Sequence, residues 1–252
     1  MSRLLHFSLL PLVLILASCI DGDEEIWLER DGSGRLEATY KMPPQIMQSF
    51  GSAPVLQKKL EDAIAKEPGL QIQHISNHME NGRVVFEFNA TFDDVRTLAA
   101  FPKKHLRSPD TPDQAGSEEA LFGTMNLTLS GLTMSFDRTV DLGPVLPDNV
   151  RQNPGFLGES AFRYVVHLPA PATTHNATGT ADNGRTLNWK FLLREHANRP
   201  MLLTMKAPLP LPWWIWLSGG LLVALVVFLA VLASRRVLIS RRSPGHGLDL
   251  TG

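Results

Sequence analysis

Apolar and polar residues alternate along several stretches of the chain, which is the pattern of strands that bury one face. Every second residue from Val84 to Phe92 is apolar, and similar alternation recurs over 162–168 and 187–191. Glycine-containing turn sequences lie between such stretches, and Asn-Gly in particular favours the type I′ turn of a hairpin. The pattern predicts three hairpins, with turns at Asp31-Gly32-Ser33-Gly34, Asn81-Gly82 and Asn183-Gly184, pairing 25–30 with 35–42, 70–79 with 83–92, and a Thr/Asn-rich run with 185–193.

The alternation changes phase within the stretch 126–136. Leu127 and Leu129 share one parity, whereas Met134 and Phe136 share the other, and Gly131 lies at the break. A β-bulge would restore the apolar face at such a point. We therefore expect one strand here, bulged at Gly131.

Two stretches have helical periodicity. In the first, Ser52 is positioned to cap a helix with Pro54 in its first turn, which would end at Pro68-Gly69. Its apolar stripe consists of Leu56, Leu60, Ala63 and Ile64. In the second, Asp93 is positioned to cap a shorter helix that contains Val95, Leu98 and Ala99 and is ended by Pro102.

Together these elements predict an α+β domain over 19–207, in which an antiparallel sheet has two short helices packed on one face. The segment from Lys103 to Glu119 is rich in Pro, Asp, Ser and Gly. Such composition is typical of an exposed loop or of a boundary between two lobes.

The N-terminal residues have the layout of a secretory signal. Arg3 precedes the apolar run Leu9–Leu16, and Leu16-Ala17-Ser18-Cys19 follows. This end resembles the lipobox of bacterial lipoproteins, which implies cleavage after residue 18 and acylation of Cys19. An ordinary signal peptide that contains a cysteine is the alternative.

The C-terminal region predicts a transmembrane helix over 213–234, because no residue from Trp213 to Ala233 is charged and roughly 20 apolar residues cross a bilayer. Aromatic residues at its start and arginines after it are typical of the two membrane interfaces, and positive charge marks the cytoplasmic side. A buried core helix is the alternative. The predicted interface residues are Trp213, Trp214, Trp216, Arg235 and Arg236, with a Pro-rich spacer at 208–212 and a basic cytoplasmic tail at 235–252.

These signals predict a protein of the bacterial cytoplasmic membrane whose domain faces the exterior or periplasm. The formal charge of the 252-residue chain is −1, which argues against a nucleic-acid partner, and its single cysteine excludes an intramolecular disulfide. Acidic residues outnumber basic ones within 20–207. Attraction of net charge to anionic lipid is therefore not the expected function of the domain.

Candidate chemistry is sparse. His74 and His78 lie roughly 13 Å apart if they share a strand, too far to share a metal ion. The acidic pairs Asp93-Asp94 and Glu118-Glu119 fall where helix N-termini are expected, and capping explains them. Asn89, Asn126 and Asn176 match glycosylation acceptors, but we interpret them as ordinary strand and turn residues of a bacterial protein. We predict no catalytic residue, no metal site and no cofactor.

The C-terminal part of the domain resembles a known family. A strand ending in Leu168-Pro169, the hairpin 183–189 with Trp189, a final strand at 201–207 and the Pro-rich approach to one span resemble LppM-like bacterial membrane lipoproteins. The resemblance implies an exported α/β domain on a lipid anchor and a single span, with a role in binding envelope lipids or glycolipids. It supplies no catalytic residues.

Three functions follow as hypotheses. The first is a non-catalytic lipoprotein that binds or presents membrane lipid in an apolar cleft. The second is an interaction or assembly subunit of an envelope protein complex, which would require an exposed strand edge or apolar patch. The third is a hydrolase, for which the sequence offers no catalytic set.

Overall fold

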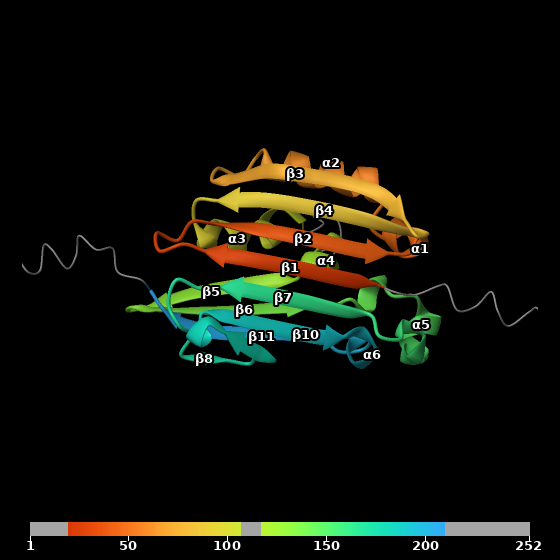
Figure 1. Ribbon diagram of the computed structural model, residues 1–252. Helices are drawn as coiled ribbons and strands as arrows, with labels where there is room; N and C mark the ends of the chain where they lie inside the picture. The colour runs from red at the N-terminus through yellow and green to blue at the C-terminus, as the bar shows by residue number, and fades with distance from the viewer. Residues whose placement is uncertain (1–19, 107–116, 210–252) are drawn as a thin grey trace, which may run out of the picture. The chain divides into compact units, whose positions relative to one another are not determined.

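The computed structural model describes residues 20–106 and 117–209, which form two β-sheets and several short helices (Figure 1). The larger sheet has the strand order β3-β4-β2-β1-β7-β10-β9, and the smaller has the order β5-β6-β11-β8. The strands of the larger sheet are β1 (Asp21–Leu28), β2 (Gly34–Met42), β3 (Leu70–Glu80), β4 (Arg83–Phe92), β7 (Ala161–His167), β9 (Gly179–Ala181) and β10 (Thr186–Leu192). Those of the smaller are β5 (Thr124–Ser130), β6 (Thr133–Val140), β8 (Thr174–His175) and β11 (Met201–Pro208).

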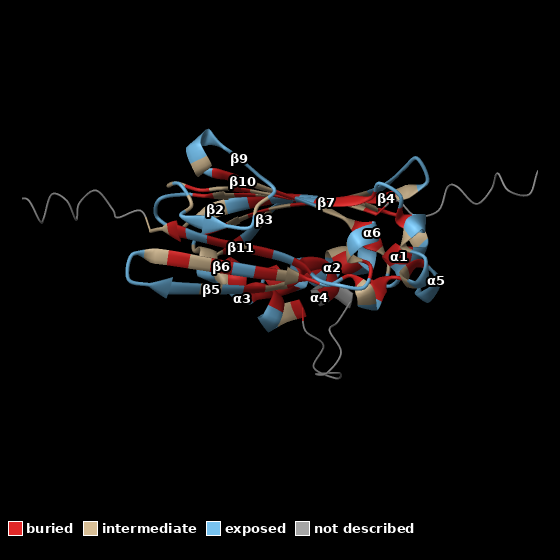
Figure 2. Cartoon of the chain, turned by 90° about the horizontal axis from the view of Figure 1, so that it is seen from below, coloured by how far each residue is buried: buried red, intermediate tan, exposed pale blue. Residues whose placement is uncertain are grey.

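The helices and the smaller sheet lie on one side of the seven-stranded sheet, so the domain has two layers (Figure 2). This arrangement confirms the α+β class, but a second sheet shares the covered face and more than two helices are present. The helices are α1 (Pro44–Gln48), α2 (Ala53–Ile64), α3 (Val95–Phe101), α4 (Ser117–Phe122), α5 (Asp148–Gln152) and α6 (Leu193–His196). Short helical turns are η1 (Pro102–Leu106, a π turn), η2 (Gly143–Val145), η3 (Pro154–Leu157) and η4 (Asp182–Gly184).

The three predicted hairpins are confirmed. β1 pairs with β2, β3 with β4, and β9 with β10, each antiparallel. Asn81 and Gly82 have φ values of 50° and 76°, the positive values that a type I′ turn requires at both central residues. Along β4, the residues that share the parity of Phe86 and Phe88 are buried, as the alternation predicts.

The predicted bulge at Gly131 is wrong. Residues 124–130 and 133–140 are two strands, β5 and β6, and Ser130 pairs directly with Thr133 across a two-residue turn. Gly131 has a φ of +58° and occupies the first turn position, where a side chain would be strained. The phase change therefore marks a reversal of the chain, and Leu132 is an exposed turn residue.

The expectation of a purely antiparallel sheet is also wrong, because β1 and β7 pair in parallel, with Gly22 opposite Phe162. Such a pair requires a long connection that returns the chain to the same end of the sheet. Residues 29–160 make that connection, and they include the hairpin β3–β4 and the hairpin β5–β6.

Both predicted helices form. α2 buries the predicted stripe and has Ser52 at its N-cap position, but the Ser52 side chain makes no capping bond. α3 is capped by Asp94, not Asp93, because the Asp94 carboxylate accepts a hydrogen bond from the Arg96 backbone N–H at 2.7 Å. Asp93 instead uses its own backbone N–H to bond the carbonyl of Gly69 at 2.9 Å.

The segment 103–119, predicted as an exposed loop or a boundary between two lobes, is helical at both of its described ends. Its first residues form the π turn η1, and Leu106 is buried there. Its last residues begin α4, whose Ala120 and Leu121 are buried against the core. The apolar residues at both described ends explain this difference, since they dock against the sheets.

Several predictions fall outside the described residues. These are the signal peptide 1–18, Cys19, the span 213–234 with Trp213, Trp214 and Trp216, and the tail with Arg235 and Arg236. Within 20–106 and 117–209, no helix combines the length and the apolar character needed to cross a bilayer.

Candidate functional site

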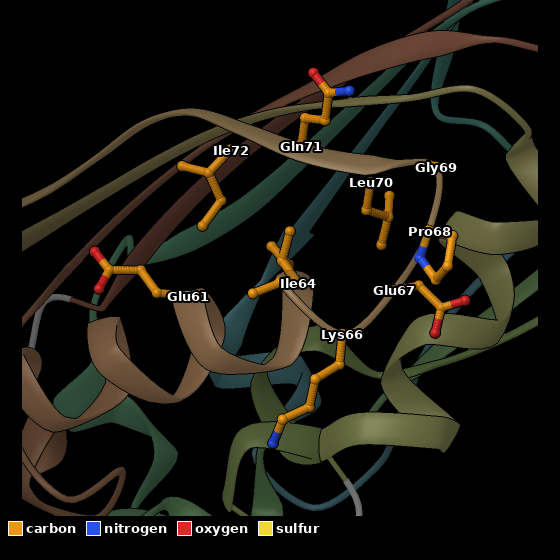
Figure 3. Close-up of a pocket in the computed structure, with 10 residues that line it drawn as sticks. Glu61, Ile64, Lys66, Glu67, Pro68, Gly69, Leu70, Gln71 and Ile72 are labelled. Atoms are coloured by element: carbon orange, nitrogen blue, oxygen red, sulfur yellow. The ribbon is translucent and has the colours of Figure 1, made fainter.

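A surface groove lies between the end of α2 and the start of the edge strand β3. Its volume is about 450 Å³. Ile64 of α2 and Leu70 and Ile72 of β3 point into the space between the two elements (Figure 3). Glu61, Lys66 and Glu67 supply charge at the rim, so the groove combines an apolar floor with a polar border.

The local sequence explains this shape. α2 ends at Ile64 because the chain reaches Pro68 and Gly69, and Gly69 adopts a φ of +87° that favours glycine. The carbonyl of Gly69 accepts the Asp93 backbone bond, which fixes the turn to the end of β4. β3 then departs from the helix, and the groove remains between them.

The rim is held by a compact ion-pair cluster. Glu67 Oε2 lies 2.7 Å from Lys104 Nζ and 2.6 Å from His105 Nε2, and the Glu67 side chain is only 12% exposed. Hydrogen bonds from Lys104 and His105 lower the pKa of Glu67 below its usual value of 4.5. The His105 ring also packs on Phe101, with 5.3 Å between ring centres. This cluster joins the α2–β3 turn to the π turn η1.

An inner apolar space lies directly behind the groove floor. It shares Ile64 and Leu70 with the groove, holds about 30 Å³, and is lined only by apolar residues. A space of this size holds about one water-sized sphere. An apolar chain would enter it only by displacing core side chains. The other residues that line it are Leu36, Leu60, Phe88, Ala90, Leu98, Phe101, Pro102, Phe122 and Met125.

A smaller groove of about 280 Å³ lies near the start of α2. Met47, Met79 and Val84 give it apolar walls, and Asn77 and His78 add polar groups. Met79 is largely exposed there.

A buried charged cluster joins the two sheets. Arg138 of β6 donates to both carboxylate oxygens of Glu24 on β1, at 2.5 and 2.9 Å, and also to the carbonyl of Phe122. Tyr40 donates to Glu24 Oε1 at 2.5 Å, and burial together with the Glu24 charge raises the pKa of Tyr40 well above 10.0. The Arg138 guanidinium lies 4.8 Å from the ring centre of Tyr164. These groups are buried, and together they act as a structural link between the two sheets.

The histidines named by the sequence have local partners. His74 Nε2 lies 3.1 Å from Ser76 Oγ and 4.0 Å from Glu87 Oε2, whereas His78 lines the smaller groove. His167 Nε2 lies 2.5 Å from Glu25 Oε1, and its ring stacks on Trp27. Across the described ranges, no group of three or more His, Cys, Asp or Glu side chains is placed to hold a metal ion.

The three asparagines lie in strands and a turn, as predicted. Asn89 is in β4, Asn126 in β5, and Asn176 follows β8. The Asn176 side chain accepts a hydrogen bond from Trp189 Nε1 at 2.7 Å and from the backbone of Thr204 at 2.8 Å. Glu118 and Glu119 lie in the first turn of α4, where a helix N-terminus is expected.

Sequence reasoning did not find the groove or the buried pair. Nothing local in the sequence links Glu67 to Lys104 and His105, because the two segments meet only in the fold. The buried pair did leave a signal. Arg138 has the parity of Met134 and Phe136 on β6, and Glu24 has the parity of Ile26 on β1. A charge on the apolar face of a strand indicates a buried partner.

Comparison with known proteins gives structural similarities only. No protein-family model and no curated protein matches the chain. The chain is similar to the NMR structure of the folded domain of Mycobacterium tuberculosis LppM, at 16% identity and a TM-score of 0.43, over 84% of this chain and 98% of that domain. It is also similar to the Danio rerio Fcho1 Mu homology domain with bound Eps15 peptide, at 12% identity and a TM-score of 0.23, over 79% and 82% of the two chains.

Proposed function

We propose that the protein is a membrane-anchored envelope lipoprotein whose domain binds or presents a lipid, without catalysis, in the groove between α2 and β3. The observation that carries this proposal is the apolar floor of Ile64, Leu70 and Ile72, which adjoins the inner apolar space. Pockets for apolar ligands combine such a floor with a few polar groups that fix orientation.

In this proposal the acyl part of a lipid lies against Ile64, Leu70 and Ile72, and its headgroup lies toward Lys66. Because the inner space holds only about 30 Å³, the lipid chain occupies the open groove and is not enclosed. Glu67 is already bonded to Lys104 and His105, which favours a supporting role over acid–base chemistry. Presentation of a lipid fits such an open site better than storage does.

The anchoring part of the proposal rests on the sequence. Acylation at Cys19 and a span over 213–234 would place the protein in the bacterial cytoplasmic membrane, with its domain outside and its C-terminus in the cytoplasm. A spanning helix holds a protein far more firmly than one acyl chain does. The span therefore determines residence, and the lipid at Cys19 keeps the domain close to the headgroups.

The test is lipid content of the full chain purified in mild detergent, measured by mass spectrometry, with Ile72→Asn and Ile75→Asn as a matched pair. Both isoleucines are partly buried on β3 against the core, but only Ile72 lines the groove. We expect Ile72→Asn to lose the copurified lipid and Ile75→Asn to retain it. Equal lipid in all three proteins, or none in the parent, would overturn lipid binding at this groove.

The headgroup contact has its own test. Lys66→Glu reverses a charge at the groove rim, whereas Lys58→Glu makes the same change within α2, at a position that does not line the groove. We expect Lys66→Glu alone to reduce binding of a fluorescent anionic phospholipid to the detergent-solubilised full chain. Similar binding by both variants would show that Lys66 does not contact the headgroup.

The edge of the larger sheet supports a second candidate function, an interaction subunit of an envelope complex. β3 has eleven residues and is the terminal strand of its sheet, and a terminal strand can pair with a strand of another protein. A photo-crosslinking residue at Gln71 in native membranes should then capture one dominant partner, whereas the same residue at Lys58 should not.

A further inference from the structure

The chain enters and leaves the described domain at opposite ends of its strands. Ile20 donates its backbone N–H to Ser160 Oγ at 3.1 Å, beside the starts of β1 and β7. Leu209 donates to the carbonyl of Leu132 at 2.8 Å, beside the β5–β6 turn where β11 ends. Leu192, the last residue of β10, pairs with Ala161 at the end of the sheet where Ile20 lies. α6 follows Leu192 directly and precedes β11, so β11 begins at that same end (Figure 1). An eight-residue strand separates the two ends by about 25 Å.

Only short segments of chain connect the two proposed anchors to the described domain. Cys19 directly precedes Ile20, and Trp213 follows Leu209 by four residues. These links reach about 4 Å and at most about 14 Å. A domain standing on either end would hold one anchor about 25 Å from the bilayer, beyond what its link allows. With both anchors in the membrane, the domain must lie with its strands along the surface.

The outer faces of the two sheets differ in chemistry. The outer face of the larger sheet carries several ion pairs, including Arg163–Asp23, His167–Glu25 and Arg35–Glu37. The outward positions of β5, β6 and β11 are mostly hydroxyl-bearing, and Asp137 and Lys206 are the charged residues among them. The hydroxyl residues include Thr128, Ser130, Thr133, Ser135, Thr139 and Thr204.

Exposed leucines mark the two ends of the smaller sheet. Leu132 is 58% exposed at the β5–β6 turn. Leu202 is 49% exposed on the outer face of β11, the strand that leads to the predicted span. Exposed leucines beside a membrane anchor are suited to the boundary between headgroups and acyl chains.

We propose that the outer face of the four-stranded sheet lies flat on the bilayer, with Leu132 of the β5–β6 turn inserted at the headgroup–acyl boundary. The occupant of this face is a phospholipid surface, whose phosphates and glycerol oxygens accept hydrogen bonds from its hydroxyl groups. The carboxylates Asp23, Glu25 and Glu37 face away from anionic lipid in this orientation. The inference rests on the anchoring part of the proposed function and is independent of the groove.

The test uses the full chain, expressed in a bacterium that acylates lipoproteins and reconstituted in phosphatidylethanolamine–phosphatidylglycerol vesicles. Single cysteines at Leu132→Cys and Glu37→Cys, both exposed sites, carry an environment-sensitive fluorophore. The parent chain has only Cys19, so its failure to take up a maleimide reports acylation. Flotation of the vesicles reports anchoring separately.

We expect lipid carrying a spin label near the headgroup to quench the fluorophore at 132 on the order of threefold more than at 37, and aqueous iodide to show the reverse. Equal quenching at the two sites in a chain that floats and is acylated would overturn the orientation while leaving the anchors in place. A chain that fails to float or takes up maleimide at Cys19 would overturn the anchoring, and the orientation with it.

Discussion

At the scale of single residues, the fold depends on a charged pair that water does not reach. Glu24 and Arg138 belong to different sheets, and both side chains are almost fully buried. Their hydrogen bonds to each other, to Tyr40 and to the Phe122 carbonyl satisfy the charges. A buried pair of this kind contributes little net stability compared with an apolar replacement, but removing one member leaves an isolated charge. The contact between the two sheets is therefore sensitive to the loss of either charge.

This argument predicts a non-additive pair of variants. Arg138→Met should destabilise the domain by about 3–5 kcal/mol, because Glu24 remains buried without its partner. The double variant Glu24→Gln/Arg138→Met should recover a large part of that loss. Urea unfolding of the full chain in detergent, followed by circular dichroism, measures both. If the double variant were as unstable as Arg138→Met, desolvated charge would not be the cause.

The two buried tyrosines beside this pair make a second prediction. Tyr40 donates a hydrogen bond to Glu24, whereas the Tyr164 hydroxyl is buried and has no hydrogen-bond partner among the described residues. Tyr40→Phe should cost about 1.5–3 kcal/mol, the value of a hydrogen bond to a charged group. Tyr164→Phe should be neutral or stabilising, since it removes an unsatisfied hydroxyl and keeps the ring over Arg138. Similar losses from both variants in urea would contradict this assignment.

At the scale of elements, the Glu67 cluster couples the α2–β3 turn to η1. Since the folded-state pKa of Glu67 lies below 4.5, the carboxylate contributes stability above that pH and loses it as pH falls through the folded pKa. Glu67→Gln should therefore lower Tm at pH 7, and its Tm should converge with that of the parent as pH falls below 4.5.

Thermal unfolding followed by circular dichroism between pH 3 and 7 measures this convergence. Glu61→Gln is the matched control, because it changes an exposed carboxylate of the same groove. Its Tm should stay close to that of the parent at every pH. A constant Tm difference for Glu67→Gln across the range would show that the loss comes from packing and not from ionisation.

Elements whose signals are local were predictable, and those that depend on distant contacts were not. Asn81-Gly82 specifies its turn by backbone conformation alone, and the stripe of α2 specifies its buried face. The prediction of a bulge at Gly131 was wrong because a bulge and a two-residue turn both shift the parity of the apolar residues along the chain. The parallel pairing of β1 with β7 has no local sequence signal, because the two strands lie 140 residues apart and their pairing is determined by tertiary packing. The groove is lined by residues within 61–72, but the gap between α2 and β3 depends on where β3 docks in the sheet, so the sequence could name Ile64 as buried but not as a groove wall.

At the scale of the whole molecule, the described domain and the predicted anchors constrain each other. The buried apolar residues of the domain form one core cluster between its two layers. Its first and last described residues are each hydrogen-bonded to the body of the domain, at Ser160 and at Leu132. An anchor at Cys19 or from Trp213 onward would therefore lie within four residues of a position that is hydrogen-bonded to the domain.

The last prediction separates the two anchors. A single acyl chain gives only marginal membrane binding, whereas a spanning helix is effectively irreversible. Cys19→Ser should therefore leave the full chain in the membrane fraction, and a chain ending at Leu209 with Cys19 intact should wash partly into the soluble fraction in alkaline carbonate. The chain that lacks both anchors should be fully soluble. Fractionation with an antibody to the domain measures all three.

Retention of the doubly altered chain in the membrane fraction would show that the domain surface itself binds the membrane strongly. Release of the Cys19→Ser chain would show that residues 213–234 do not span the membrane.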